Sequence, residues 1–316
     1  MRSDVTIVIV TFNSEASIGV CLTSILGQGH GLSQQVIVVD NDSSDSTVEI
    51  VKSQFPDVKL IRPGRNLGFS RGVNLGASQS NSEFILLLNP DTVILRNAIV
   101  TIVGFARLNP RAGLYGGRTL KQDGTLEPSS CWGVPTLWSL AMFALGATAV
   151  FPRSRLLDPE SLGGWQRDSN REVGVITGCF MLVHHEAWIK LGGLDERFFM
   201  YGEDVDFAMR ARGLGYYPSI CHEAELIHEV GKSSATPLHK MRLLFRGKAM
   251  LLRKHWGGGE MWLGLLLLQF GTGLRSALHR LRCVVRRDEY TDHWTALWRE
   301  RGDWLQGYAT NSGKVD

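Results

Sequence analysis

The chain has 316 residues, of which 44% are hydrophobic and 21% are charged, and its formal net charge is +3. This composition is that of a globular protein with a sizeable core, and it excludes a low-complexity chain. Its five cysteines form no Cys-x-x-Cys pair, which argues against a disulfide framework or a zinc site and favours a reducing compartment. The N-terminus lacks the apolar core of a signal peptide, so we expect a cytoplasmic protein.

The first 120 residues alternate between apolar runs and helical patterns. Short runs rich in Val, Ile and Leu predict four strands, at residues 5–10, 36–39, 58–61 and 84–88. Between them we expect helices, from a cap at Asn13 or Ser14 to about Leu26, from Ser44 or Asp45 onward, and over 68–80. Such alternation predicts a mostly parallel sheet with helices on both faces.

Polar side chains follow several of these strands, namely Thr11, Asp40 and Asp91. Ligands of such sheets bind beyond the carboxyl ends of the strands. A carboxylate at Asp40 could accept hydrogen bonds from a nucleobase or ribose, although Asp is also favoured in a helix-capping loop. Asp91 offers one carboxylate to a hard divalent cation beside a diphosphate; a plain turn is the alternative.

An acidic cluster lies at Glu203, Asp204 and Asp206, beside aromatic residues. Neighbouring carboxylates repel one another, which raises the pKa of one of them and suits a general base; a helix N-terminus is the milder explanation. Asp206 is spaced for an i,i+4 pair with Arg210, so we assign it a structural role. We therefore predict Asp204 as the chemical group and leave Glu203 unassigned.

A further polar group follows at the end of a strand-like run. His228 could be a metal ligand or an ordinary hydrogen-bonded histidine, and Lys232 and Ser233 are candidates for holding phosphate.

The C-terminal region is basic. Residues 240–287 contain eleven Lys or Arg and one acidic residue, which indicates either a face for an anionic membrane or nucleic acid, or a solvated helical face. Two uncharged runs, 136–151 and 261–274, are shorter than the roughly 20 residues that span a bilayer. The first suits a membrane interface, a buried core or an oligomer contact. The second is interrupted by glycines and flanked by basic residues, and with its Leu and Trp side chains it favours a membrane surface over nucleic acid.

Six motifs occur in a familiar order: VTIVIVTFNSE at 5–15, VIVVDNDSSDST at 36–47, RNLGFSRGVNLG at 65–76, FILLLNPDT at 84–92, TGCFMLVHHEAWIKLGGLDERFFMYGEDVDFAMRARG at 177–213 and HEVGKS at 228–233. On these motifs the chain resembles family 2 glycosyltransferases of the GT-A fold, in their rhamnosyltransferase-like branch of bacterial polysaccharide assembly. The resemblance covers about residues 4–256. It implies a GT-A domain over 1–239, with a nucleotide-binding half (1–120) and an acceptor and catalytic half (121–239), and then a helical basic extension over 240–316.

The resemblance also implies roles for individual residues on the donor side. The nucleotide pocket would be lined by Thr11, Asn13 and Glu15, with Asp40 reading the base and Asp42 nearby. The ribose and diphosphate side would be shaped by Arg65, Asn66, Gly68, Phe69 and Asn74. Asp91 matches the last acid of the family's metal-binding Asp-x-Asp, whose first acid is replaced here by Asn89.

For catalysis, the resemblance implies that Asp204 is the base and that His228 joins Asp91 in holding Mg²⁺ or Mn²⁺. The acceptor side would include Gly193, Asp195, Glu203 and Trp165. The implied reaction is an inverting sugar transfer from a nucleotide-sugar to a saccharide or lipid-linked saccharide, at the inner membrane surface. We expect dTDP-rhamnose as donor, with a UDP- or GDP-sugar as the alternative.

Other classes of protein fit the sequence less well. A nucleotidyltransferase would need a glycine-rich, basic loop after the first strand, and residues 11–15 contain neither glycine nor a basic residue. A non-catalytic, membrane-associated scaffold would leave the six motifs unexplained.

Overall fold

The computed structural model describes residues 3–28, 31–228, 236–286 and 293–308. Contacts divide the chain into two compact units that alternate along the sequence. The first unit contains Met1–Trp132, Trp165–Phe199 and Glu203–Ser234, and the second contains Gly133–Gly164, Met200–Gly202 and Ala235–Asp316. The second unit thus combines the C-terminal helices with residues 133–164, whereas the sequence suggested a division at residue 239.

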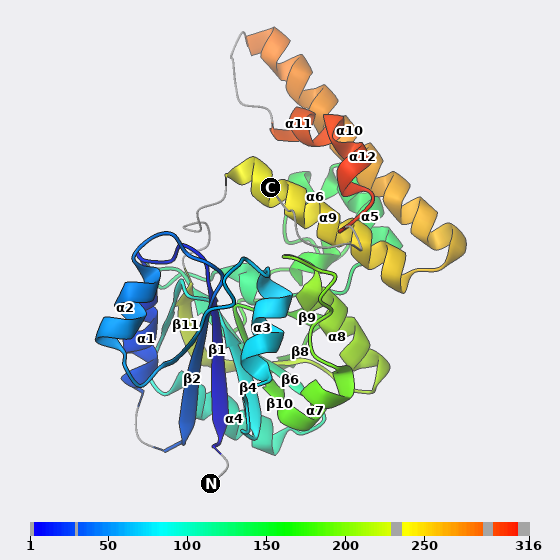
Figure 1. Ribbon diagram of the computed structural model, residues 1–316. Helices are drawn as coiled ribbons and strands as arrows, with labels where there is room; N and C mark the ends of the chain where they lie inside the picture. Colours follow the sequence, from blue (N-terminus) through cyan, green and yellow to red (C-terminus); the bar gives the residue numbers. More distant parts are fainter. Residues whose placement is uncertain (1–2, 29–30, 229–235, 287–292, 309–316) are drawn as a thin grey trace. The chain divides into compact units, whose positions relative to one another are not determined.

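The first unit is built on a sheet of nine strands in the order β3-β2-β1-β4-β10-β6-β11-β5, with β8 paired to β11 (Figure 1). The strands are β1 (Val5–Thr11), β2 (Gln34–Asp40), β3 (Lys59–Ile61), β4 (Phe84–Leu88), β5 (Thr92–Ile94), β6 (Leu114–Leu120), β8 (Arg171–Glu172), β10 (Phe180–His184) and β11 (Ser219–His228). A separate pair joins β7 (Cys131–Trp132) to β9 (Val175–Ile176). Strands β1 to β4 pair in parallel, as do β6 and β11, whereas β10 and β5 run antiparallel to their neighbours. The predicted mostly parallel α/β sheet is confirmed.

Helices cover both faces of this sheet because successive side chains of a strand point to opposite faces. The helices of the first unit are α1 (Ile18–Leu26), α2 (Thr47–Gln54), α3 (Phe69–Ala77), α4 (Ala98–Leu108), α7 (His185–Leu191) and α8 (Glu203–Gly213). Ile7 and Ile9 of β1 belong to the core cluster that includes α1 and α4. Val8 and Val10 point the other way and contact Gly76 and Gly72 of α3. All of β1 is therefore buried.

The predicted start of the first helix was wrong. Helix α1 begins at Ile18, because Asn13 has a left-handed backbone (φ +50°) and its Oδ1 accepts a hydrogen bond from the Ser44 N–H. Likewise α2 begins at Thr47, after Ser46, rather than directly after Ser44 or Asp45. Polar side chains of the loops after β1 and β2 form hydrogen bonds from one loop to the other. These bonds compete with the capping of a helix by the same side chains.

The second unit is helical, with α5 (Leu137–Ala144), α6 (Ala147–Val150), α9 (Pro237–His255), α10 (Gly258–Arg286), α11 (His293–Arg299) and α12 (Arg301–Trp304). Its core contains Leu140, Phe245, Leu268 and Trp304. Residues 136–151 therefore contribute to a core, in two helices that are separated at the left-handed Gly146.

Glycines do not interrupt the second uncharged run, contrary to expectation. Residues 261–274 lie inside the continuous helix α10, where Gly264 approaches Trp256 and Gly271 approaches Phe143 too closely for a larger residue. In the described parts of the chain, no helix is both long and apolar enough to cross a membrane.

Candidate active site

Two predicted metal ligands, Asp91 and His228, meet at the edge of the sheet formed by the carboxyl ends of β4 and β11. Strand β11 pairs antiparallel with β5 so that His228 lies opposite Thr92, next to the end of β4. This register brings His228 Nε2 to 3.4 Å from Asp91 Oδ1 and 3.5 Å from Asn89 Nδ2. Burial lowers the pKa of the His228 imidazole, but the adjacent Asp91 carboxylate and Cys179 side chain outweigh this effect and raise the pKa to about 10.

The donor atoms at this edge suit a divalent cation. Asp91 Oδ1 is buried and accepts no hydrogen bond from the described residues, since its contact with His228 is longer than a good hydrogen bond. A free carboxylate oxygen facing an imidazole nitrogen is a ligand pair that Mg²⁺ or Mn²⁺ accepts, with phosphate oxygens and water completing the shell. Asn89 brings an amide rather than a second charge to the site.

The segment Gly178–Cys179, just before β10, connects this pair to the acidic cluster. The Asn89 N–H donates to the Cys179 carbonyl at 3.1 Å. The backbone N–H groups of Gly178 and Val205 both donate to the Asp204 carboxylate, the latter at 2.8 Å. Asp204, at the start of α8, is thereby held beside the same short segment that supports Asn89.

Two carboxyl groups of the cluster have perturbed pKa values. Burial raises the pKa of Asp204 to about 6, against the backbone N–H groups that lower it. Burial, and next the charge of Asp204, raise the pKa of Glu203 well above its usual value, and Glu203 Oε2 is buried without a hydrogen-bond partner among the described residues. A pKa of about 6 suits a carboxyl group that accepts a proton at neutral pH. Asp206 is fully buried and pairs with Arg210 at 2.9 Å, so its predicted structural role is confirmed.

Asp40, which was predicted to read the base, is fully buried at the end of β2. It accepts hydrogen bonds from the Thr11 hydroxyl and the Ser43 N–H, both at 3.2 Å, and Arg62 Nε lies 4.0 Å away. Asn13 and Glu15 tie the loop after β1 to the loop after β2, because they accept hydrogen bonds from the backbone of Ser44 and Ser46.

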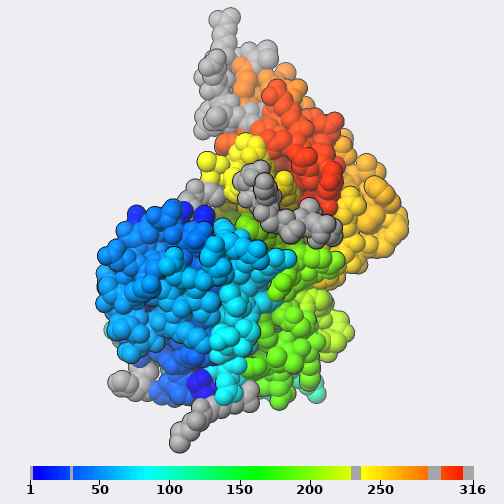
Figure 2. Space-filling model, viewed as in Figure 1, coloured from blue at the N-terminus to red at the C-terminus, as the bar shows by residue number. Residues whose placement is uncertain are grey.

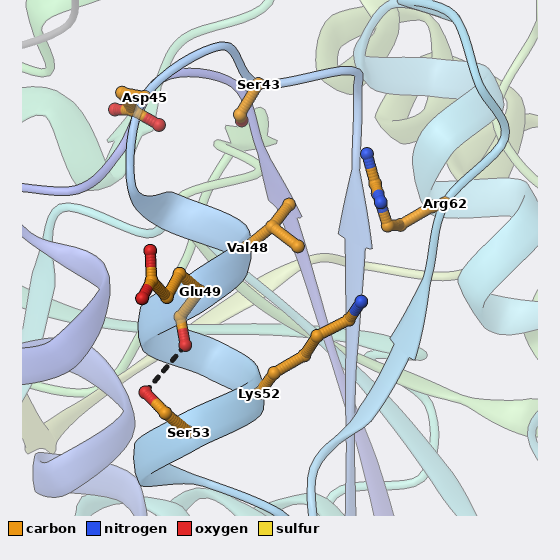
Figure 3. A pocket seen from close by; sticks show the side chains of 7 residues that line it. All are labelled: Ser43, Asp45, Val48, Glu49, Lys52, Ser53 and Arg62. Carbon is orange, nitrogen blue, oxygen red and sulfur yellow. Dashed lines mark hydrogen bonds between the residues drawn. The ribbon is translucent and has the colours of Figure 1, made fainter.

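The two bonded loops adjoin an open depression of about 480 Å³, lined by Ser43, Asp45, Val48, Glu49, Lys52, Ser53 and Arg62 (Figure 3). It adjoins Asp40 through Ser43 and Arg62 and carries side chains of both charges. Asp42, in the same loop, has a left-handed backbone with φ +67°.

The loop before α3 makes a close approach to the segment before the acidic cluster. Gly68 has φ +78°, and a Cβ there would lie 2.5 Å from the Phe199 carbonyl oxygen, which accepts the Phe69 N–H at 2.7 Å. Asn66 Oδ1 accepts the Gly68 N–H. Arg65 is exposed.

Asn74, which was predicted on the donor side, is hydrogen-bonded within the protein. Its side chain exchanges two hydrogen bonds with the Leu194 backbone, at 2.9 and 3.0 Å, and so supports the turn at 193–196.

Sequence reasoning missed residues that hold this edge together. Buried Asn41 donates a hydrogen bond from Nδ2 to the Gly68 carbonyl at 3.0 Å. It lies in the 36–47 motif between Asp40 and Asp42, the two residues for which the sequence predicted a role. Arg62 and the pair Gly178 and Cys179 carried no separate signal in the sequence.

The predicted acceptor-side residues are engaged within the protein. The Gly193 carbonyl accepts a hydrogen bond from Arg210, and Asp195 pairs with Arg197 at 2.6 Å. The guanidinium groups of Arg167 and Arg171 lie 5.2 and 5.1 Å from the centre of the Trp165 ring. Lys232 and Ser233 lie outside the described residues.

Several known proteins are similar to this chain. The family model "Glycosyl transferase family 2" matches residues 6–185. The N-acetylglucosaminyl-diphospho-decaprenol L-rhamnosyltransferase of Mycobacterium tuberculosis is 30% identical in an alignment that covers 78% of this chain and 85% of that protein. Rhamnosyltransferase WbbL of Escherichia coli is 23% identical over 63% of this chain and 75% of its own length.

Among solved structures, mannosyltransferase PcManGT of Pyrobaculum calidifontis, in complex with GDP-Man and Mn²⁺, superposes with a TM-score of 0.57 at 15% identity. The superposition covers 98% of this chain and 86% of that one, and it supports the GT-A fold. The matched family model and the similarity to rhamnosyltransferases show that the chain belongs to glycosyl transferase family 2, in its rhamnosyltransferase-like branch.

Proposed function

We propose that the chain transfers L-rhamnose from dTDP-rhamnose to a saccharide or lipid-linked saccharide, with inversion at the anomeric carbon. The observation that carries this proposal is that one short segment, Gly178–Cys179, connects the metal-ligand pair to the acidic cluster. Asp91 lies beside His228, and the backbone of the segment bonds to Asn89 on one side and to Asp204 on the other. The link between a carboxyl group with a pKa of about 6 and a carboxylate–imidazole pair supports a base that acts beside a bound metal.

The charged side chains at the edge of the sheet suggest how the nucleotide-sugar binds. Asp91 and His228 would hold Mg²⁺ or Mn²⁺, which neutralises charge on the leaving nucleoside diphosphate when bound. Asp40 is held by Thr11 and Ser43 at the end of β2, where its oxygens can also accept the N–H of a pyrimidine base.

The acceptor end requires a base. Asp204 accepts the proton of the acceptor hydroxyl as that oxygen attacks the anomeric carbon from the side opposite the diphosphate. A single displacement from the opposite side inverts the configuration. Burial raises the pKa of Glu203 well above its usual value, which disfavours a second negative charge next to the base.

Similar proteins support the choice of substrate. The M. tuberculosis relative is named as a rhamnosyltransferase with an N-acetylglucosaminyl-diphospho-decaprenol acceptor. This name favours rhamnose as the sugar and a lipid-linked saccharide as the acceptor, and we place the reaction at the inner membrane surface. The Mn²⁺ in the P. calidifontis complex favours a metal-dependent reaction. A UDP- or GDP-sugar is the alternative donor.

A thermal-shift panel tests the donor directly. We expect dTDP-rhamnose with Mn²⁺ to raise the melting temperature more than UDP- or GDP-sugars, since a ligand at 100 times its Kd stabilises the native state by about 2.7 kcal/mol. Donors that stabilise the protein should then release nucleoside diphosphate when acceptor is added. A larger shift with UDP- or GDP-sugars would contradict the choice of donor, and no shift with any nucleotide-sugar would contradict the proposed function.

A further inference from the structure

Helix α10 of the second unit has two apolar faces. One face is buried and includes Leu265 and Leu268 in the core of that unit. The other carries large apolar side chains that are 47–62% exposed, and we call them the outer stripe: Trp262, Leu263, Leu266, Phe270, Leu278 and Leu281. Trp262, Leu266 and Phe270 follow one another at i,i+4 spacing and therefore lie along one side of the helix.

This arrangement differs from that of an ordinary surface helix, whose outer face is polar. Between Met261 and Leu274 there is no charged residue on either face. The stripe runs for about 28 Å at 1.5 Å per residue. A row of exposed large apolar side chains of this kind marks an interaction site.

The charges around the outer stripe identify its partner. Arg280 and Arg282 are exposed on the same helix at the end of the stripe, and Arg253 is exposed on α9. The sequence from 240 to 287 has eleven basic residues against one acidic residue. A second copy of this chain would bring like charges together, whereas anionic lipid headgroups would neutralise them.

We propose that the outer stripe of α10 lies in the headgroup region of an anionic bilayer, with the helix axis parallel to the membrane surface. Leu266 and Phe270 enter the acyl boundary, Trp262 sits at the interface as tryptophan prefers, and Arg280 and Arg282 contact lipid phosphates. This inference rests on the membrane location included in the proposed function and specifies the surface responsible, but it does not depend on the sugar transferred.

Vesicle co-sedimentation of the full chain tests this surface. The wild-type protein should sediment with phosphatidylcholine vesicles that contain phosphatidylglycerol, and more weakly with phosphatidylcholine alone. Leu266→Glu with Phe270→Glu should weaken binding by about tenfold or more, because two buried apolar groups become charged. Arg280→Glu with Arg282→Glu should remove the preference for anionic vesicles.

The matched control is Leu108→Glu, at an 84% exposed position on α4 of the first unit, and it should bind vesicles like the wild type. Melting curves establish that each variant is folded, and sedimentation analysis establishes its oligomeric state. Absence of wild-type binding, equal binding by the stripe variant, or a dimer that the stripe variant dissociates would each overturn the inference.

Donor turnover with a water-soluble acceptor, measured without vesicles, separates this inference from the proposed function. Turnover without vesicle binding would overturn only the lipid-facing surface. Vesicle binding without turnover of any nucleotide-sugar would overturn only the proposed function.

Discussion

The Nε2 atom of His228 lies 3.4 Å from the Oδ1 atom of Asp91, although the two residues are far apart in the sequence. They meet because β11 pairs antiparallel with the short strand β5, which directly follows Asp91. The site is therefore produced by strand pairing, and each side chain should matter for binding a cation.

Replacement of His228 or Asp91 by alanine should weaken Mn²⁺ binding in the presence of nucleoside diphosphate by at least about tenfold, or roughly 1.4 kcal/mol. Titration calorimetry measures this affinity. His222→Ala is the matched control, since His222 lies elsewhere on β11 and its imidazole bonds to Asn170 instead. Unchanged Mn²⁺ affinity in both site variants would rule out this pair as ligands.

Turnover should depend on pH through Asp204, whose pKa burial raises to about 6. A general base acts only when it is ionised, so kcat/KM should fall about tenfold for each pH unit below this value and level off above it. A pH series with saturating metal and fixed acceptor measures the profile. A rate that is constant from pH 5 to about 8 would exclude a base of this pKa.

Stability should respond to Glu203, whose pKa burial raises well above the ordinary value of 4.5. The folded state thus favours the protonated form, and the wild type loses stability as pH rises above the unfolded pKa and through the folded one. Glu203→Gln has no proton to lose, so it should melt higher, by about 2–4 °C for each kcal/mol gained. The difference should grow between pH 5 and 8, and exposed Glu223→Gln should show no such trend. A lower melting temperature for Glu203→Gln at pH 8 would contradict this account.

Because Gly68 lies so close to Phe199, any side chain at position 68 should destabilise the folded protein. Gly68→Ala combines an unfavourable backbone angle (φ +78°) with a Cβ only 2.5 Å from the Phe199 carbonyl oxygen. Gly64 has a similar angle (φ +75°) and open space around it, so Gly64→Ala measures the backbone effect alone. We expect Gly64→Ala to destabilise by about 1 kcal/mol and Gly68→Ala by clearly more, with reduced donor affinity, in denaturant unfolding and binding assays. Equal effects would show that the contact with Phe199 is unimportant.

The sequence predicted the elements that depend on local pattern. The apolar runs at 5–10, 36–39 and 84–88 became β1, β2 and β4, and the Asp206 and Arg210 spacing became an ion pair on α8. These features succeed because periodicity and helix spacing are properties of neighbouring residues.

What the sequence could not supply depends on contacts between distant segments. Asn13 and Ser14 were predicted as helix caps, yet Asn13 bonds to Ser44 in the loop after β2 and Ser14 bonds to Thr47 at the start of α2, and α1 begins only at Ile18. Asn74 matched a donor-binding motif, yet its amide bonds to Leu194. Neither partner can be identified without the packed sheet.

The most direct test of the account is the turnover of Asp204→Asn, measured with saturating donor and Mn²⁺ beside its donor affinity by calorimetry. We expect turnover to fall by about 10²–10⁴-fold, the usual contribution of a general base, while the donor Kd stays that of the wild type. Full turnover in Asp204→Asn would contradict the assignment of Asp204 as the base and, with it, the central claim.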